Sequence, residues 1–167
     1  MQATVSSGRG RTMAIDIHAL NDFIVRAKAG TYVGDGEHAT PSRLGSHDLR
    51  FVEGEWAYLD SYFGGSDFIG QEVVYFAEKP VWAMNYYGCI LREELLTAAQ
   101  AGQMIKASLS RMYREGRFLG GFEHTENDLT YMDTNTGNAD SFQGREFICR
   151  GQEVAYELVY HGGLIKD

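Results

Sequence analysis

Acidic residues set among aromatic ones are the part of this sequence best suited to chemistry. Asp60 lies in the segment YLDSYF, and Glu72 lies in the segment FIGQEVV that follows it. A carboxyl group enclosed by aromatic rings is poorly solvated, so its pKa rises and it can act as a general acid or base. The alternative is a structural role, in which Glu72 and Glu146 accept hydrogen bonds from the neighbouring backbone or from Arg43. We keep both interpretations open.

Arg43 is the cationic residue that we expect beside these acids. It lies in the polar loop PSRLGSHD, ahead of the aromatic segments. An arginine in such a loop can bind a carboxylate or a phosphate through two nitrogens, or it can tie the loop to Asp48 or Asp60. We therefore expect a cluster of charged and polar groups with aromatic rings around it. The candidate ligand-binding residues are Arg43, Asp60, Tyr62, Glu72, Trp82, Asn85 and Tyr86.

Other kinds of catalytic site have no sequence pattern here. No two histidines are three or four residues apart, the spacing that brings two metal ligands together on one helix. Neither Cys89 nor Cys149 belongs to a CxxC motif, and the GxSxG motif of hydrolases does not occur. We therefore expect no metal, no cofactor and no nucleophilic residue, and the sequence gives no positive sign of an enzyme.

Two amphipathic helices are predicted to position these residues. The first spans 16–29, with Asp16 as its N-cap and Gly30 as its C-cap. The second spans 92–113 and has apolar residues at steps of three and four from Leu95 onward. The apolar stripe of the first helix is formed by Ile17, Leu20, Ile24 and Ala27.

Segments of alternating apolar and polar residues predict strands joined as antiparallel hairpins. Trp82, Met84 and Tyr86 share one face of such a strand, which we expect to face the core. Glycine-rich loops are predicted over 31–46 and 116–128. The predicted strands are 48–52, 55–63, 70–77, 80–87, 129–134, 144–149 and 153–160.

A repeat relates the two halves of the chain. Phe68, Gly70, Glu72, Tyr86 and Gly88 recur at one constant spacing as Phe142, Gly144, Glu146, Tyr160 and Gly162. This recurrence predicts an internal duplication, with pseudo-repeats over 15–91 and 92–167. No alternation of strand and helix demands parallel pairing. We predict a disordered leader over 1–14 and a single α+β domain over 15–167, in which an antiparallel β-sheet carries two helices.

Composition excludes several classes of partner. The formal net charge of the 167 residues is −8, which disfavours binding to nucleic acid or to an anionic membrane surface. No secretory segment and no apolar run of about 18 residues is present, so we expect a cytoplasmic protein. A homodimer and a small-molecule ligand remain as the expected partners.

Several segments of the chain resemble an uncharacterised bacterial family. They are TYVGDG, PSRLGSHDL, YLDSYFGG, FIGQEVV, PVWAMNYYG and the closing FQGREFICRGQEVAYELVYHGG. In that family the domain occurs alone or behind a helix-turn-helix DNA-binding domain of the xenobiotic-response-element type. The resemblance brings no activity and no binding residues with it, but fusion to a regulator implies a sensor or effector-binding role.

Three functions are therefore weighed. The first is a small-molecule or effector-binding module, with aromatic walls and polar anchors supplied by the candidate residues. The second is an enzyme that uses Asp60 or Glu72 as acid or base. The third is a self-associating structural protein without a ligand. A cavity between the sheet and the loop over 31–46 favours the first two, and a filled core with a broad apolar surface favours the third.

Overall fold

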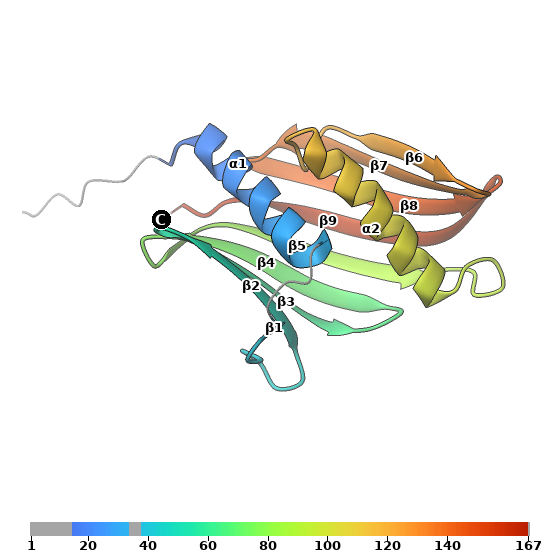
Figure 1. The fold of residues 1–167 in the computed structure, drawn as a ribbon, viewed down its shortest axis with the longest axis horizontal. Helices are drawn as coiled ribbons and strands as arrows, with labels where there is room; N and C mark the ends of the chain where they lie inside the picture. The colour runs from blue at the N-terminus through green and yellow to red at the C-terminus, as the bar shows by residue number, and fades with distance from the viewer. Residues whose placement is uncertain (1–14, 34–37, 167) are drawn as a thin grey trace, which may run out of the picture.

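The computed structural model describes residues 15–33 and 38–166, so the predicted leader over 1–14 lies outside the described residues. Within these ranges nine strands form one antiparallel sheet, and two helices lie on the same face of it (Figure 1). The predicted α+β class is therefore confirmed. The elements are α1 (Ile17–Lys28), β1 (His38–Ala39), β2 (His47–Glu53), β3 (Trp56–Gly64), β4 (Phe68–Phe76), β5 (Lys79–Ile90), α2 (Ala98–Arg114), β6 (Phe122–Glu126), β7 (Leu129–Asn138), β8 (Ser141–Arg150) and β9 (Glu153–Leu164).

The strand order places the two halves of the chain side by side. The order is β1-β2-β3-β4-β5-β9-β8-β7-β6, so each half is a series of neighbouring hairpins. The last strands of the two halves, β5 and β9, pair in the middle of the sheet, with Tyr86 opposite Tyr160. The helix-then-strands order of the first half, α1 to β5, returns in the second half as α2 to β9.

The ends of α1 follow from local hydrogen bonding. Asp16 caps the helix as predicted, and its carboxylate accepts hydrogen bonds from the backbone N–H groups of His18 (2.9 Å) and Ala19 (3.4 Å). The prediction that Gly30 ends the helix is wrong. Ala29 is the C-cap, and the chain continues as a π-helical turn over Ala29–Val33.

The helix α2 begins six residues later than its apolar pattern suggested. Thr97 is its N-cap, and Thr97 and Gln100 exchange hydrogen bonds between side chain and backbone in a capping box. The residues before it still bury apolar surface, since Leu96 is almost fully buried. The helical spacing of apolar residues therefore begins before the helix itself, so this spacing could not locate the first helical residue.

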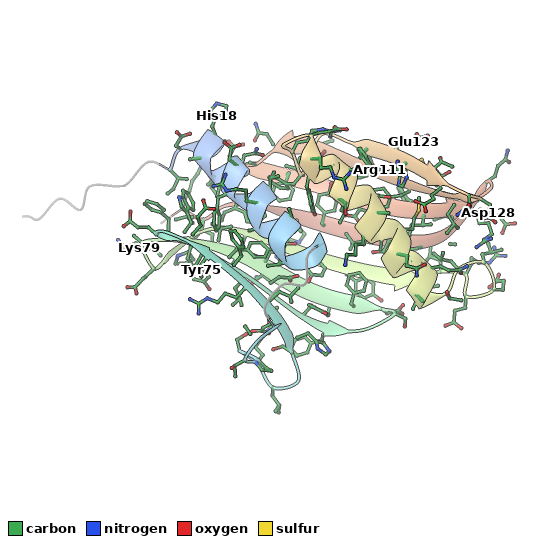
Figure 2. The ribbon with its side chains drawn as sticks, viewed as in Figure 1. His18, Tyr75, Lys79, Arg111, Glu123 and Asp128 are labelled. Carbon is green, nitrogen blue, oxygen red and sulfur yellow. The ribbon has the colours of Figure 1, made fainter. Side chains whose placement is uncertain are left out.

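The core lies between the sheet and the two helices. Trp82, Met84 and Tyr86 all face it, as predicted. The exposed side chains of His18 on α1 and Arg111 on α2 lie on the other side of the helices, toward solvent (Figure 2). Within the described ranges, neither helix has the length and hydrophobicity needed to cross a bilayer.

Candidate functional site

Because Gly70 has no side chain, Tyr86 can reach across it to Asp60. Gly70 on β4 lies between Tyr62 on β3 and Tyr86 on β5. A Cβ atom added at Gly70 would overlap the Tyr86 hydroxyl. Because that space is empty, the ring of Tyr86 lies across β4, and its hydroxyl donates to Asp60 Oδ1 at 2.6 Å, two strands away.

The second half of the sheet repeats this arrangement. Tyr160 on β9 lies over Gly144 on β8, and its hydroxyl donates to Asp133 Oδ1 on β7 at 2.7 Å. These tyrosines and glycines are the residues that recur in the sequence. The repeated pattern thus builds the same hydrogen bond twice, once to Asp60 and once to Asp133.

Lys28 is the cation that enters this part of the core. It lies in the last turn of α1, and its Nζ is 2.7 Å from Oε1 and 2.6 Å from Oε2 of Glu72. Both side chains are only 8% exposed. Glu72 lies directly opposite Asp60 in the pairing of β3 with β4, so the ion pair lies beside a second acid on the adjacent strand.

The prediction that Arg43 accompanies these acids is wrong. Its Nη2 donates to the backbone oxygen of Ser61 at 2.7 Å, and its guanidinium lies over the ring of Phe63. Neighbouring residues of a strand point to opposite faces of the sheet. Ser61 and Phe63 therefore face away from Asp60, and Arg43 lies on the opposite face.

Two other candidate residues also lie elsewhere. Asn85 is exposed on the face away from the helices, and its side-chain oxygen accepts a hydrogen bond from Gln71. Trp82 is on the core face but is fully buried, and its Nε1 donates to the backbone oxygen of Ala139 at 2.9 Å. Its ring stacks on Phe142 and does not line the cavity described next.

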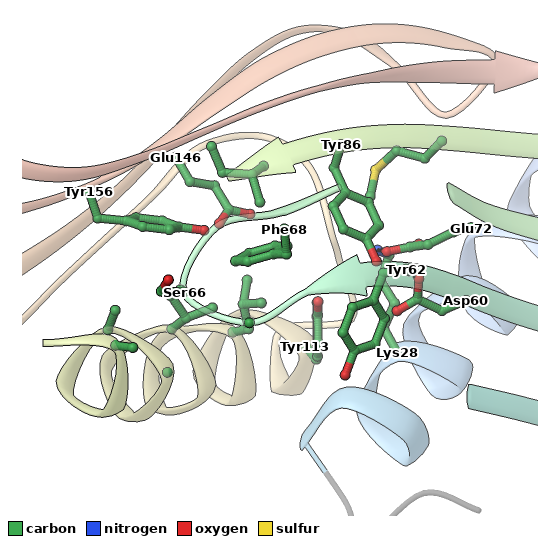
Figure 3. Close-up of a pocket in the computed structure, with 18 of the residues that line it drawn as sticks. Lys28, Asp60, Tyr62, Ser66, Phe68, Glu72, Tyr86, Tyr113, Glu146 and Tyr156 are labelled. Carbon is green, nitrogen blue, oxygen red and sulfur yellow. Dashed lines mark hydrogen bonds and ion pairs between the residues drawn. The ribbon is translucent and has the colours of Figure 1, made fainter. Parts of the chain in front are cut away.

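The remaining four candidates line one cavity of about 230 Å³: Asp60, Tyr62, Glu72 and Tyr86. This cavity lies between the sheet and α2, and no described residue of the predicted loop over 31–46 lines it. Figure 3 shows them gathered beside Lys28, with Glu146 and Tyr156 farther along the cavity. The wall on the α2 side is mostly apolar or small and comprises Ala98, Ala101, Gly102, Ile105 and Leu109, together with Tyr113. At the rim lie exposed residues of the β3–β4 turn and of α2, namely Gly65, Ser66, Ala98 and Gly102.

Burial makes two acids of this cavity, Asp60 and Glu146, hard to ionise. Burial first, and then the charge of Glu72, raise the pKa of Asp60 to about 7, although the Tyr86 hydrogen bond and Lys28 oppose the rise. Burial and then Asp133 raise the pKa of Glu146 to about 8, against the effects of Lys28 and Tyr131. Glu146 keeps some water-accessible surface because it lines the cavity.

Comparison with known proteins places this site in a family. Residues 60–165 match the model of a domain of unknown function, DUF5680. The chain belongs to the DUF5680 family. The match begins at Asp60 and extends through the strands that carry Glu72, Tyr86 and Glu146. No curated protein and no solved structure matches the chain.

Lys28 precedes the matched DUF5680 segment and was not among the predicted site residues. A basic residue in the last turn of a helix is ordinarily an exposed partner of the helix dipole. The available signal was its spacing, because Lys28 follows Ile24 by four residues and so continues the apolar stripe. Glu146 was identified as the repeat partner of Glu72, and the repeat was the signal that it belongs to the same cluster.

A second acid–base group in this DUF5680 chain is structural. Ser108 Oγ lies 2.9 Å from His124 Nδ1, and His124 Nε2 lies 3.8 Å from Glu126. This serine–histidine–acid arrangement is the one that activates a nucleophilic serine. Ser108 is fully buried, however, and its hydroxyl donates to the backbone oxygen of Met104. The hydroxyl proton is therefore already committed, and the pair serves to join α2 to β6.

Proposed function

We propose that this domain binds a small organic molecule in the cavity between the sheet and α2. The observation that supports the proposal is a cavity of about 230 Å³ with an apolar wall on the helix side and charged groups at one end. Ligand sites are typically concave, mostly apolar and supplied with a few convergent polar groups. An apolar cavity of ~150 Å³ can hold benzene. The site therefore suits a molecule with one aromatic ring and a short polar arm.

The rim supports entry without unfolding. Gly65 and Ser66 belong to an exposed turn, and Gly102 lies on the exposed side of α2. A Cβ atom added at Gly102 would meet no atom within 4 Å, so there is open space in front of it. This glycine costs the helix about 1 kcal/mol relative to alanine, and an open cavity rim is a reason for it.

The second half offers only a small counterpart of this cavity. Beside Asp133 and Tyr160 there is a space of about 30 Å³, lined in part by Phe118 and Leu119. If the chain arose by duplication, as the matching hydrogen bonds to Asp60 and Asp133 support, the larger space has been kept beside Asp60. The second half then contributes α2 and Glu146 to the lining of that one cavity.

The proposal is tested with phenethyl alcohol, a neutral molecule with one ring and one hydroxyl, in protein-observed NMR titrations. We expect amide shifts at Gly65, Ser66 and Gly102. Gly102→Phe places a ring at the rim and should abolish them. Gln103→Phe, an exposed neighbour that does not line the cavity, should leave them intact. Shifts that persist in Gly102→Phe would overturn the proposal. So would the absence of shifts in the wild-type protein with this alcohol and also with phenethylamine and phenylacetate.

An acid–base enzyme is the second candidate, favoured by the pKa of Asp60 near 7 on a carboxyl group that lines the cavity. A molecule extracted from the purified protein would be compared after incubation with the wild type and with Asp60→Asn. Chemical conversion by the wild type alone would favour catalysis, and recovery of unchanged molecule from both would contradict it.

Self-association is the third candidate. Ile69, Tyr87 and Val159 are exposed and lie next to one another across β4, β5 and β9, on the face away from the helices. Sedimentation velocity of the wild type and of Tyr87→Lys tests this. A dimer that dissociates in the variant supports self-association through this face, and a monomeric wild type contradicts it.

A further inference from the structure

We infer that the cavity selects a small organic cation, a protonated amine on an apolar body, over neutral and anionic molecules of the same shape. This inference rests on the proposed function and adds the chemical class of the ligand. It follows from the balance of charged groups around the cavity and from the aromatic residues that line it.

The cavity has more acids than cations. Lys28, Asp60, Glu72 and Glu146 all line it, and Lys28 lies against Glu72. Among the ion pairs of residues 15–33 and 38–166, none includes Asp60 or Glu146. Two carboxyl groups thus face the same space without a contacting positive charge. A bound cation would supply that charge, whereas an anion would meet three acids and one lysine that is already paired.

Aromatic rings supply the rest of the environment that a cation requires. The face of an aromatic ring attracts a cation, and the attraction strengthens where water is excluded. Six aromatic residues line the cavity: Tyr58, Tyr62, Phe68, Tyr86, Tyr113 and Tyr156. Tyr86 also fixes the position of one acid by donating to Asp60 Oδ1. The cavity therefore combines ring surfaces with oriented carboxyl groups.

Binding of a cation is expected to release a proton. An acid with a raised pKa is protonated at neutral pH, and a positive charge beside it favours the ionised form. The groups that act on Asp60 come from four elements: Lys28 of α1, Asp48 of β2, Glu72 of β4 and Tyr86 of β5. Those that act on Glu146 are Lys28 of α1, Glu72 of β4, and Tyr131 and Asp133 of β7. Only one of these groups is a cation, so both acids ionise reluctantly and a bound amine must displace their protons. The affinity for an amine should therefore rise with pH until both acids are ionised in the free protein.

The experiment compares three molecules of similar size that differ in charge: the cation phenethylamine, the neutral phenethyl alcohol and the anion phenylacetate. At about pH 8.5 we expect phenethylamine to bind at least about tenfold more tightly than the alcohol, and phenylacetate to bind least. At about pH 5.5 phenethylamine should lose at least about tenfold in affinity, while the alcohol changes little. Calorimetry in two buffers of different ionisation enthalpy should show proton release for the amine alone.

Variants locate the effect. Asp60→Asn and Glu146→Gln should each weaken phenethylamine binding by a much larger factor than they change phenethyl alcohol binding. Glu123→Gln, an exposed carboxylate on β6, is the matched control and should change neither (Figure 2). Equal binding of amine and alcohol, both blocked by Gly102→Phe, would overturn the cation inference and leave the binding function standing. No binding by any of the three molecules would contradict both.

Discussion

The buried pair of Lys28 and Glu72 gives the most demanding prediction about stability. Replacing Lys28 with methionine keeps an unbranched apolar side chain and removes the charge, leaving Glu72 without its cation. Both side chains are 8% exposed, so water cannot replace the lost partner. Removing one partner of a buried ion pair costs about 3–5 kcal/mol in the free energy of unfolding. We expect a loss of that size at about pH 8.

The loss should depend on pH because the variant can relieve it by protonating Glu72. An unfolded glutamate has a pKa of about 4.3. In folded Lys28→Met the carboxyl group is buried without a cation, and burial disfavours its charged form. The folded variant then binds more protons than the unfolded chain above about pH 4, and its stability falls as the pH rises. The difference from wild type should therefore shrink toward about pH 5.

Urea unfolding followed by tryptophan fluorescence measures this difference at several pH values. The double variant Lys28→Met/Glu72→Gln removes both charges and should recover much of the stability lost in Lys28→Met. A loss below about 1 kcal/mol at pH 8, the size typical of an exposed ion pair, would refute the reasoning. So would a loss that is the same at every pH.

Three further predictions concern the same core. The raised pKa values of Asp60 (about 7) and Glu146 (about 8) mean that wild-type stability contains a contribution that is lost as pH rises from about 4 to about 8. Asp60→Asn should therefore make the urea midpoint depend less on pH over this range. An unchanged pH dependence would count against a raised pKa of Asp60. Gly70→Ala should lower stability by about 1–3 kcal/mol, because the added methyl group overpacks the space that the Tyr86 ring fills. Gly102→Ala, in open space, should raise stability by up to about 1 kcal/mol. Equal effects of the two variants in thermal melts would be inconsistent with this difference in surroundings. Trp82→Ala should cost about 3–5 kcal/mol in urea unfolding, and a cost near zero would mean that the ring is not buried.

Much of the fold could be predicted because its strands alternate clearly. Trp82, Met84 and Tyr86 identified the core face of β5, and the hairpins follow from that alternation. The strand β6 was missed because Phe122–Glu126 is short and was placed inside a predicted glycine-rich connection. The start of α2 was misplaced because apolar spacing continues through Leu95 and Leu96, while the capping box at Thr97 decides the boundary.

The candidate site was only half predictable, for a physical reason. Asp60, Glu72 and Tyr86 share a face through strand parity and direct pairing, both of which local patterns reveal. The position of Arg43 could not be predicted in this way, because a loop can pass to either face of a sheet. Arg43 contacts Ser61 on the face away from Asp60. Lys28 depends on how α1 docks on the sheet, and no local pattern fixes that angle.

The most direct test of the central claim is an intermolecular NOE measurement on the protein saturated with phenethylamine or phenethyl alcohol, whichever binds more tightly. Binding in the cavity predicts NOEs from the ligand's ring and methylene protons to Ile105 on α2 and to Tyr86 on β5, both of which line the space. Both should disappear in Gly102→Phe. NOEs to Ile69 and Tyr87 on the opposite face, with none to Ile105, would contradict the claim.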